Sequence, residues 1–173
     1  GGYYHYIGEA NIGKANKNAT DKKVDPKIVG NTNTNTLNAD SSFKNTFAIL
    51  NGFGKLIFRF GENCPLAISG DYLYNLGAPA DNMAFQGGAR LGNTKEPGNF
   101  FIGYNFKYLQ KDATISLFVE DQLGGTDFQA HEGILGVKIF SDTILSATLQ
   151  ARNGIKVPGD TVYTFRGNFI QTF

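Results

Sequence analysis

The chain has 173 residues and a formal net charge of +1, from 16 basic and 15 acidic side chains, so its charge gives no reason to expect nucleic acid as a partner. Charged residues make up 18 % of it and it holds 22 glycines, 15 Phe and 8 Tyr without any Trp, a composition that favours strands and turns. No segment approaches the roughly 18 consecutive apolar residues of a membrane-spanning helix, which excludes helical membrane proteins but not barrels, whose strands turn only every second side chain toward lipid.

The first third of the chain differs from the rest. Residues 1–13 predict a first strand, over Tyr3–Ile12. Residues 14–42 are polar and rich in Asn, Thr and Lys. Such a segment cannot bury enough apolar surface to fold alone, so we interpret it as a long polar loop or linker.

Residues 43–173 predict antiparallel barrel strands, and their first segment, Phe43–Phe60, allows two interpretations. Asn51-Gly52 lies between apolar runs, which is a hairpin signal. A glycine inside one long strand can instead mark a bulge. We favour the single long strand.

Apolar and polar residues alternate with a period of two through most of the chain after Phe60, which indicates strands and not helices. The predicted strands are Leu66–Asn75, Met83–Leu91, Phe100–Tyr108, Ala113–Glu120, Leu135–Phe140, Thr143–Arg152 and Tyr163–Phe173. Together with the two earlier segments they make about nine strands, or about ten with the hairpin.

Alternation does not say which face meets lipid, because a soluble barrel has the same period with its apolar side inward. Three features favour apolar residues outward. The polar faces hold small residues and isolated charges of both signs, aromatic residues gather near strand ends, and short turns tend to alternate with longer links. The sequence therefore predicts an all-β, antiparallel transmembrane β-barrel with about 8–10 strands in this chain, either complete or part of a larger barrel.

The predicted connections fall into two classes. Tight turns are expected near Glu62-Asn63, Gln110-Lys111-Asp112 and Ser141-Asp142. Longer links are expected at Leu76–Asn82, Asn93–Asn99, Gln122–Ala130 and Asn153–Asp160.

Several blocks between Pro65 and Phe173 occur in an order that resembles the C-terminal half of the bacterial putative-porin family. They are Asp71-Tyr72-Leu73-Tyr74-Asn75, the Gly-rich strand Phe85–Gly92, the turn Lys111-Asp112-Ala113, and Asp121–Asp127 followed by His131-Glu132-Gly133. The resemblance implies a location in the bacterial outer membrane and passive transport, without a known substrate. Members of that family are generally longer, with additional strands before this region, which implies either that this chain lacks an N-terminal part or that it belongs to a short variant.

The C-terminal strand carries Tyr163, Phe165, Phe169 and Phe173 on one face. Alternate aromatics that end on a terminal Phe look like the signal by which the barrel-assembly machinery recognises its substrates. Gln171 departs from that pattern.

Residues that would indicate catalysis or metal binding are sparse. His5 and His131 are far apart and Cys64 is the only cysteine, so no metal site or disulfide is expected. Gly124-Gly125-Thr126-Asp127 precedes a strand and not a helix, so we interpret it as a turn and not a phosphate site. The sequence predicts a protein that is not an enzyme and that binds no cofactor.

The leading functional hypothesis is a porin-like channel for passive diffusion of small polar solutes. The candidate pore-lining residues are Asp71, Arg90, Lys107, Glu120, Lys138, Arg152 and Arg166, since rings of charge set selectivity in pores. The alternatives are a structural or adhesive outer-membrane barrel without an open pore and a soluble lipocalin-like binding barrel. The expected partners are outer-membrane lipid, the barrel-assembly machinery, and either a homo-oligomer or a second chain that completes the barrel.

Overall fold

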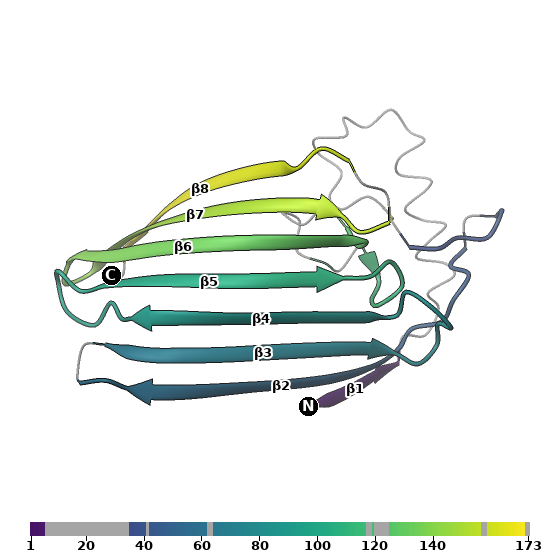
Figure 1. The fold of residues 1–173 in the computed structure, drawn as a ribbon, viewed down its shortest axis with the longest axis horizontal. Helices are drawn as coiled ribbons and strands as arrows, with labels where there is room; N and C mark the ends of the chain where they lie inside the picture. The colour runs from purple at the N-terminus through teal and green to yellow at the C-terminus, as the bar shows by residue number, and fades with distance from the viewer. Residues whose placement is uncertain are drawn as a thin grey trace. The chain divides into compact units, whose positions relative to one another are not determined.

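The protein is an all-β structure in the part of the chain that the computed structural model describes, residues 1–5, 35–40, 42–61, 64–116, 119, 125–156 and 159–171. Eight strands are present (Figure 1): β1 (Gly2–His5), β2 (Ala48–Arg59), β3 (Pro65–Asn75), β4 (Met83–Gly92), β5 (Phe100–Leu109), β6 (Phe128–Phe140), β7 (Thr143–Gly154) and β8 (Val162–Gln171). None of the described residues belongs to a helix that is long and apolar enough to cross a membrane.

The strands form one sheet in which each strand pairs with its neighbours in the sequence, in the order β1 to β8. β1 pairs antiparallel with β2, with Gly2 opposite Asn51. β7 pairs antiparallel with β8, with Thr143 opposite Gln171 at one end and Arg152 opposite Val162 at the other. Among the described strands, β1 and β8 are the two ends of this order. The sequence correctly predicted an all-β antiparallel sheet, while its closure into a transmembrane barrel stays a prediction.

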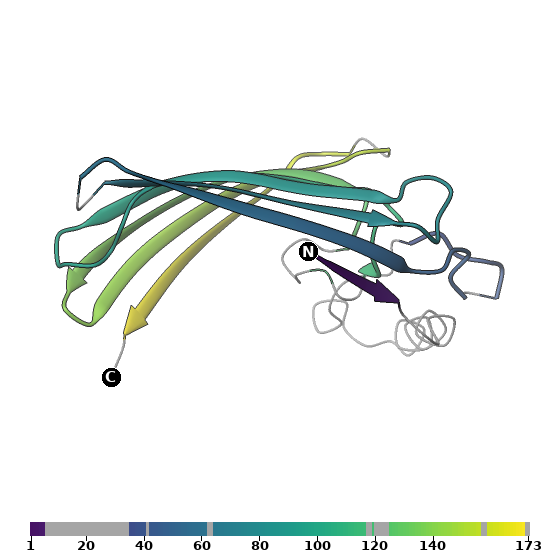
Figure 2. The ribbon, with the colours of Figure 1, turned by 90° about the horizontal axis from the view of Figure 1, so that it is seen from below.

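Two compact units make up the chain. The first contains 1–52, 72–85 and 109–128, and the second contains 53–71, 86–108 and 129–173. The second unit includes nearly all of β6 and the whole of β7 and β8, which run side by side in both views (Figure 1 and Figure 2).

The first unit has a small apolar core and a buried network of polar side chains. Phe43, Phe47 and Ile115 form the core. The Asn75 side chain is fully buried and donates hydrogen bonds to the backbone oxygens of Thr46 (3.0 Å) and Asp112 (2.8 Å). Its oxygen accepts hydrogen bonds from two backbone N–H groups, those of Ala48 and Gly77. A single amide therefore ties together three segments that are far apart in the sequence.

The predicted strand over Ala113–Glu120 is wrong in its described part, residues 113–116 and 119, and the rest of it lies outside the described residues. Residues 113–116 are irregular, and Ala113, Ile115 and Ser116 are completely buried. Their backbone is held by Asn35, whose side chain donates to the Thr114 carbonyl (2.8 Å) and accepts from the Ser116 N–H (2.8 Å). The alternating apolar residues Ala113 and Ile115 are therefore buried in the first unit and do not form one face of a strand.

Two other predicted boundaries change. Phe43–Phe60 contains one long strand, β2, which passes through Asn51-Gly52 without a hairpin but begins only at Ala48. The predicted strand Leu135–Phe140 is longer than expected, because β6 begins at Phe128, inside the expected link Gln122–Ala130. The expected total of about nine strands becomes eight in the described residues.

Several of the predicted connections are present in the structure. A two-residue turn, Ser141-Asp142, joins β6 to β7, and the longer links at 76–82, 93–99 and 155–161 separate the strands on either side of them. The turn at Gln110-Lys111-Asp112 is present, although no strand follows it directly. The predicted turn at Glu62-Asn63 and most of the 14–42 segment lie outside the described residues.

Candidate functional site

Strands β3–β8 present one apolar face and one polar face, and the apolar face is the more exposed one. On β7, Leu149 is 56 % exposed, whereas its neighbour Gln150 is 1 % exposed. On β8, Phe165 is 72 % exposed. The apolar side chains that share this exposed face include Ile68, Phe85, Leu91, Phe100, Ile102, Leu135, Ile139, Leu145, Tyr163 and Phe169. A protein folded in water normally shows the reverse arrangement.

A buried carboxylate, Glu132 of β6, lies on the polar face of the second unit. Its side chain is 6 % exposed, and two cations contact the same oxygen, Oε2. Lys107 Nζ of β5 lies 3.5 Å away, and Arg166 Nη2 of β8 lies 3.2 Å away. A carboxylate this deeply buried needs such partners, because an isolated charge out of water is strongly destabilising.

Two amide side chains complete this group, which we call the polar belt (Asn105, Lys107, Glu132, Gln150 and Arg166). Asn105 Nδ2 donates to Glu132 Oε1 at 3.0 Å, and Gln150 Nε2 donates to Oε2 at 3.4 Å. The belt therefore crosses four strands, β5 to β8, with the carboxylate accepting from three of them. It stabilises one register of these strands, since a slip of one residue would move every member to the apolar face.

Glycines on two strands make room for larger groups on the same face. A Cβ at Gly88 of β4 would overlap the side-chain oxygen of Asn105, and one at Gly136 of β6 would overlap the ring of Phe101. The Arg90 guanidinium also contacts this ring, with its central carbon 3.5 Å from the centroid of Phe101. Such a cation–π contact stabilises the guanidinium without neutralising its charge.

The predicted pore-lining residues have different environments in the structure. Lys107 and Arg166 meet at Glu132. Arg90 stacks on Phe101, and Lys138 Nζ donates to the backbone oxygen of Lys95 at 2.6 Å. Asp71 and Arg152 share this face by alternation along β3 and β7. Glu120 lies outside the described residues.

The apolar face carries one polar pair near the beginning of β6. The Tyr104 hydroxyl and His131 Nδ1 are 2.6 Å apart, and the ring of Phe106 lies 5.0 Å from that of His131. His131 is therefore part of a strand and an aromatic cluster, and not a loop residue. The described residues contain no group of three or more His, Cys, Asp or Glu side chains that could hold a metal ion.

The predicted assembly signal is partly within the described residues. Tyr163, Phe165 and Phe169 alternate along β8, so they share one face of the strand, and all three are strongly exposed. Phe173 lies outside the described residues. The recognition of this strand by an assembly machinery stays a prediction.

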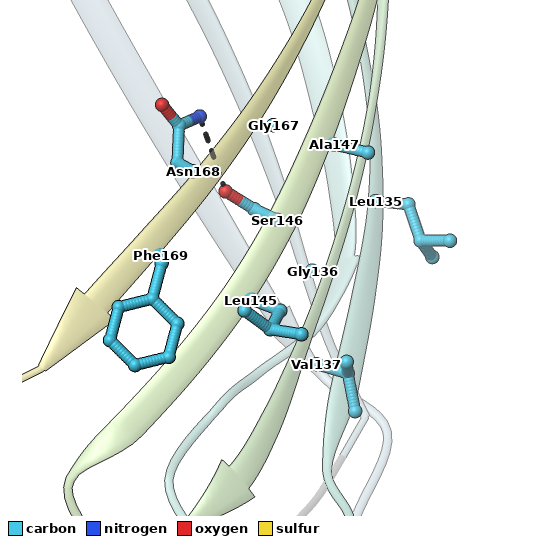
Figure 3. Close-up of a pocket in the computed structure, with 9 residues that line it drawn as sticks. All are labelled: Leu135, Gly136, Val137, Leu145, Ser146, Ala147, Gly167, Asn168 and Phe169. Carbon is cyan, nitrogen blue, oxygen red and sulfur yellow. Dashed lines mark hydrogen bonds between the residues drawn. The ribbon is translucent and has the colours of Figure 1, made fainter.

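A hollow of about 410 Å³ lies at β6, β7 and β8 (Figure 3). Its lining includes Leu135, Leu145 and Phe169, and the small residues Ala147 and Gly167 leave the space among them. Asn168 Nδ2 donates to Ser146 Oγ at 3.4 Å, as the dashed line in Figure 3 shows, and these two side chains alternate onto the opposite, polar face of β7 and β8. None of the nine residues that line the hollow has a titratable side chain.

Three members of the polar belt, Glu132, Asn105 and Gln150, were absent from the residues predicted as functional. Glu132 was missed because the strand was expected to begin only at Leu135. With the strand extended back to Phe128, Glu132 falls three alternate positions before Lys138 and on the same face. Asn105 and Gln150 carry no charge, so nothing in the sequence separates them from other polar strand residues.

Comparisons with known proteins leave the family of this chain open: no protein-family model matches it, and neither a curated protein nor a solved structure shows significant similarity. The resemblance of Pro65–Phe173 to the C-terminal half of a bacterial porin family therefore stays a prediction that rests on the sequence blocks alone.

Proposed function

We propose that this chain forms an outer-membrane β-barrel, or part of one, that acts as a porin-like channel for passive diffusion of small polar solutes. The observation that carries the proposal is the contrast between the two faces of β3–β8. Large apolar side chains such as Phe165 and Leu149 are exposed, while Gln150 and Glu132 on the opposite face are buried. This arrangement suits strands with lipid outside and a polar interior.

The distribution of charge supports the same orientation. All seven charged residues of β3–β8 alternate onto the polar face, namely Asp71, Arg90, Lys107, Glu132, Lys138, Arg152 and Arg166. A charged side chain on the lipid face of a barrel costs roughly 2–4 kcal/mol at the midplane. A soluble lipocalin-like barrel has no reason to keep apolar strand faces outward, so these strands favour a membrane location over that alternative.

The proposed mechanism is diffusion along the polar face, without a catalytic step or a cofactor. Side chains on that face would replace part of a solute's water shell, and the apolar face would contact lipid chains, for which the hollow at Leu145 and Phe169 offers space. In the proposed setting the partners are outer-membrane lipid and the barrel-assembly machinery, with a homo-oligomer or second chain adding strands if the barrel is wider than this sheet.

Conductance in planar bilayers tests the proposal. The full chain is folded into vesicles and fused with the bilayer, with vesicles that contain detergent but no protein as the control. We expect stepwise conductance. If the chain inserts, as judged by protection of its strands from protease, and no conductance appears at any voltage, the channel proposal is wrong.

A barrel without an open pore is the second candidate, and the polar belt favours it. Glu132 and Gln150 are both buried, and an interior of about eight strands is filled by side chains. In that case the belt would serve as packing, as in a structural or adhesive outer-membrane protein. Strands that are protected from protease in vesicles, without any conductance, would favour this candidate. A chain that stays monomeric and folded in the absence of detergent would exclude both the channel and the closed barrel.

A further inference from the structure

The charge of the polar face in the second unit is unbalanced. On strands β3–β8 this face holds two acidic residues, Asp71 and Glu132, and five cations, Arg90, Lys107, Lys138, Arg152 and Arg166. The opposite face of β3–β8 holds none of the Asp, Glu, Lys or Arg residues of these described strands. The whole chain is almost neutral, with a net charge of +1, so the excess of positive charge is a property of this face and not of the composition.

From this imbalance we infer that the channel prefers small anions over cations. The inference rests on the proposed function, because it concerns the solutes that would pass along this face. A face of one charge sign raises the local concentration of oppositely charged ions, and low-dielectric walls strengthen the effect.

The surroundings of the individual charges strengthen this inference. Glu132 is 6 % exposed and contacts two cations, so its negative charge is already compensated within the belt. Arg90 and Lys138 contact neutral groups, the ring of Phe101 and the backbone oxygen of Lys95. Their positive charges are oriented by these contacts without being cancelled by them.

The contribution of one such charge is large enough to measure. A unit charge about 4 Å from an ion in water changes the ion's local concentration roughly fivefold, and salt at 0.1 M screens this over about 10 Å. We therefore expect chloride to permeate about threefold or more faster than potassium at low salt, and the preference to weaken at high salt.

The reversal potential of the full chain in planar bilayers under a KCl gradient tests the inference. The expected reversal potential lies closer to the equilibrium potential of chloride than to that of potassium. Open channels that prefer potassium, or that show no preference, would overturn the anion inference and leave the channel proposal intact. An inserted protein without conductance would instead overturn the channel proposal and this inference with it.

Charge variants assign the preference to this face. Arg90→Glu changes the charge by two units and should therefore reduce the chloride preference by more than the roughly fivefold effect of one unit charge, whereas Glu132→Gln should increase it. Lys44→Glu is the matched control, because Lys44 is exposed and lies before β2, outside the strands. If Arg90→Glu does not fold, judged by circular dichroism, Arg90→Gln gives a smaller shift of the same sign. Equal shifts for Arg90 and Lys44 variants would overturn the assignment.

Discussion

Glu132 offers the sharpest test of how this sheet is held together. In Glu132→Gln the shape of the side chain is kept, but the carboxylate that accepts from Asn105 and Gln150 and pairs with Lys107 and Arg166 is lost. Both cations would then face an uncharged group in a part of the sheet from which water is largely excluded. The amide group that replaces one carboxylate oxygen is itself a donor, whereas Asn105, Lys107, Gln150 and Arg166 all present donors to Glu132.

The size of the expected loss of stability follows from how exposed Glu132, Lys107 and Arg166 are. Removing one member of a buried ion pair costs about 3–5 kcal/mol, whereas an exposed pair contributes about 0–1 kcal/mol. The Glu132 side chain is 6 % exposed, but those of Lys107 and Arg166 are 13 % and 26 % exposed, so both cations can regain some water. We therefore expect Glu132→Gln to lower the free energy of unfolding by roughly 2–3 kcal/mol.

Urea unfolding from lipid vesicles, followed by circular dichroism, measures this loss. With about 1–3 kcal/mol per molar urea for a chain of this class, the midpoint should fall by about 1 M or more. Glu96→Gln is the control, because Glu96 is exposed in the link between β4 and β5. A Glu132→Gln midpoint equal to that of Glu96→Gln would refute the view that this carboxylate stabilises the register of β5–β8.

Three further substitutions test other parts of the structure. Gly136→Ala should destabilise the sheet by about 1–3 kcal/mol, because the added methyl group would overlap the ring of Phe101 on β5. Gly167→Ala is the control and should not destabilise it, because nothing lies within 4 Å of a methyl group there. Equal urea midpoints for the two variants would contradict this prediction. Phe165→Lys should reduce insertion into vesicles by about 2–4 kcal/mol, and Thr164→Lys on the polar face should reduce it much less; protease protection distinguishes them. Asn75→Ala leaves several buried backbone groups without partners and should cost about 1–3 kcal/mol or more, with faster hydrogen exchange at the amides of residues 48 and 77 as the readout.

Local alternation in the sequence determined most of the strands, because side chains on an extended backbone point to opposite faces in turn. The segments around β3, β4, β5, β7 and β8 were predicted within a few residues. The single strand through Asn51-Gly52 was also favoured correctly. The same rule failed over residues 113–116, where Ala113 and Ile115 are buried and Ile115 packs in the core with Phe43 and Phe47. A short alternating run has the same appearance in a packed irregular segment.

The sequence by itself also determined that charge gathers on one face of the strands, since positions such as Arg90, Lys107 and Arg166 follow directly from the period of two. Only the tertiary structure decided that Lys107 and Arg166 meet at Glu132, with Asn105 and Gln150 beside them. The physical reason is that alternation depends on the backbone of one strand, whereas these contacts depend on the register between strands, which is set by link lengths, close packing at glycines and long-range pairing.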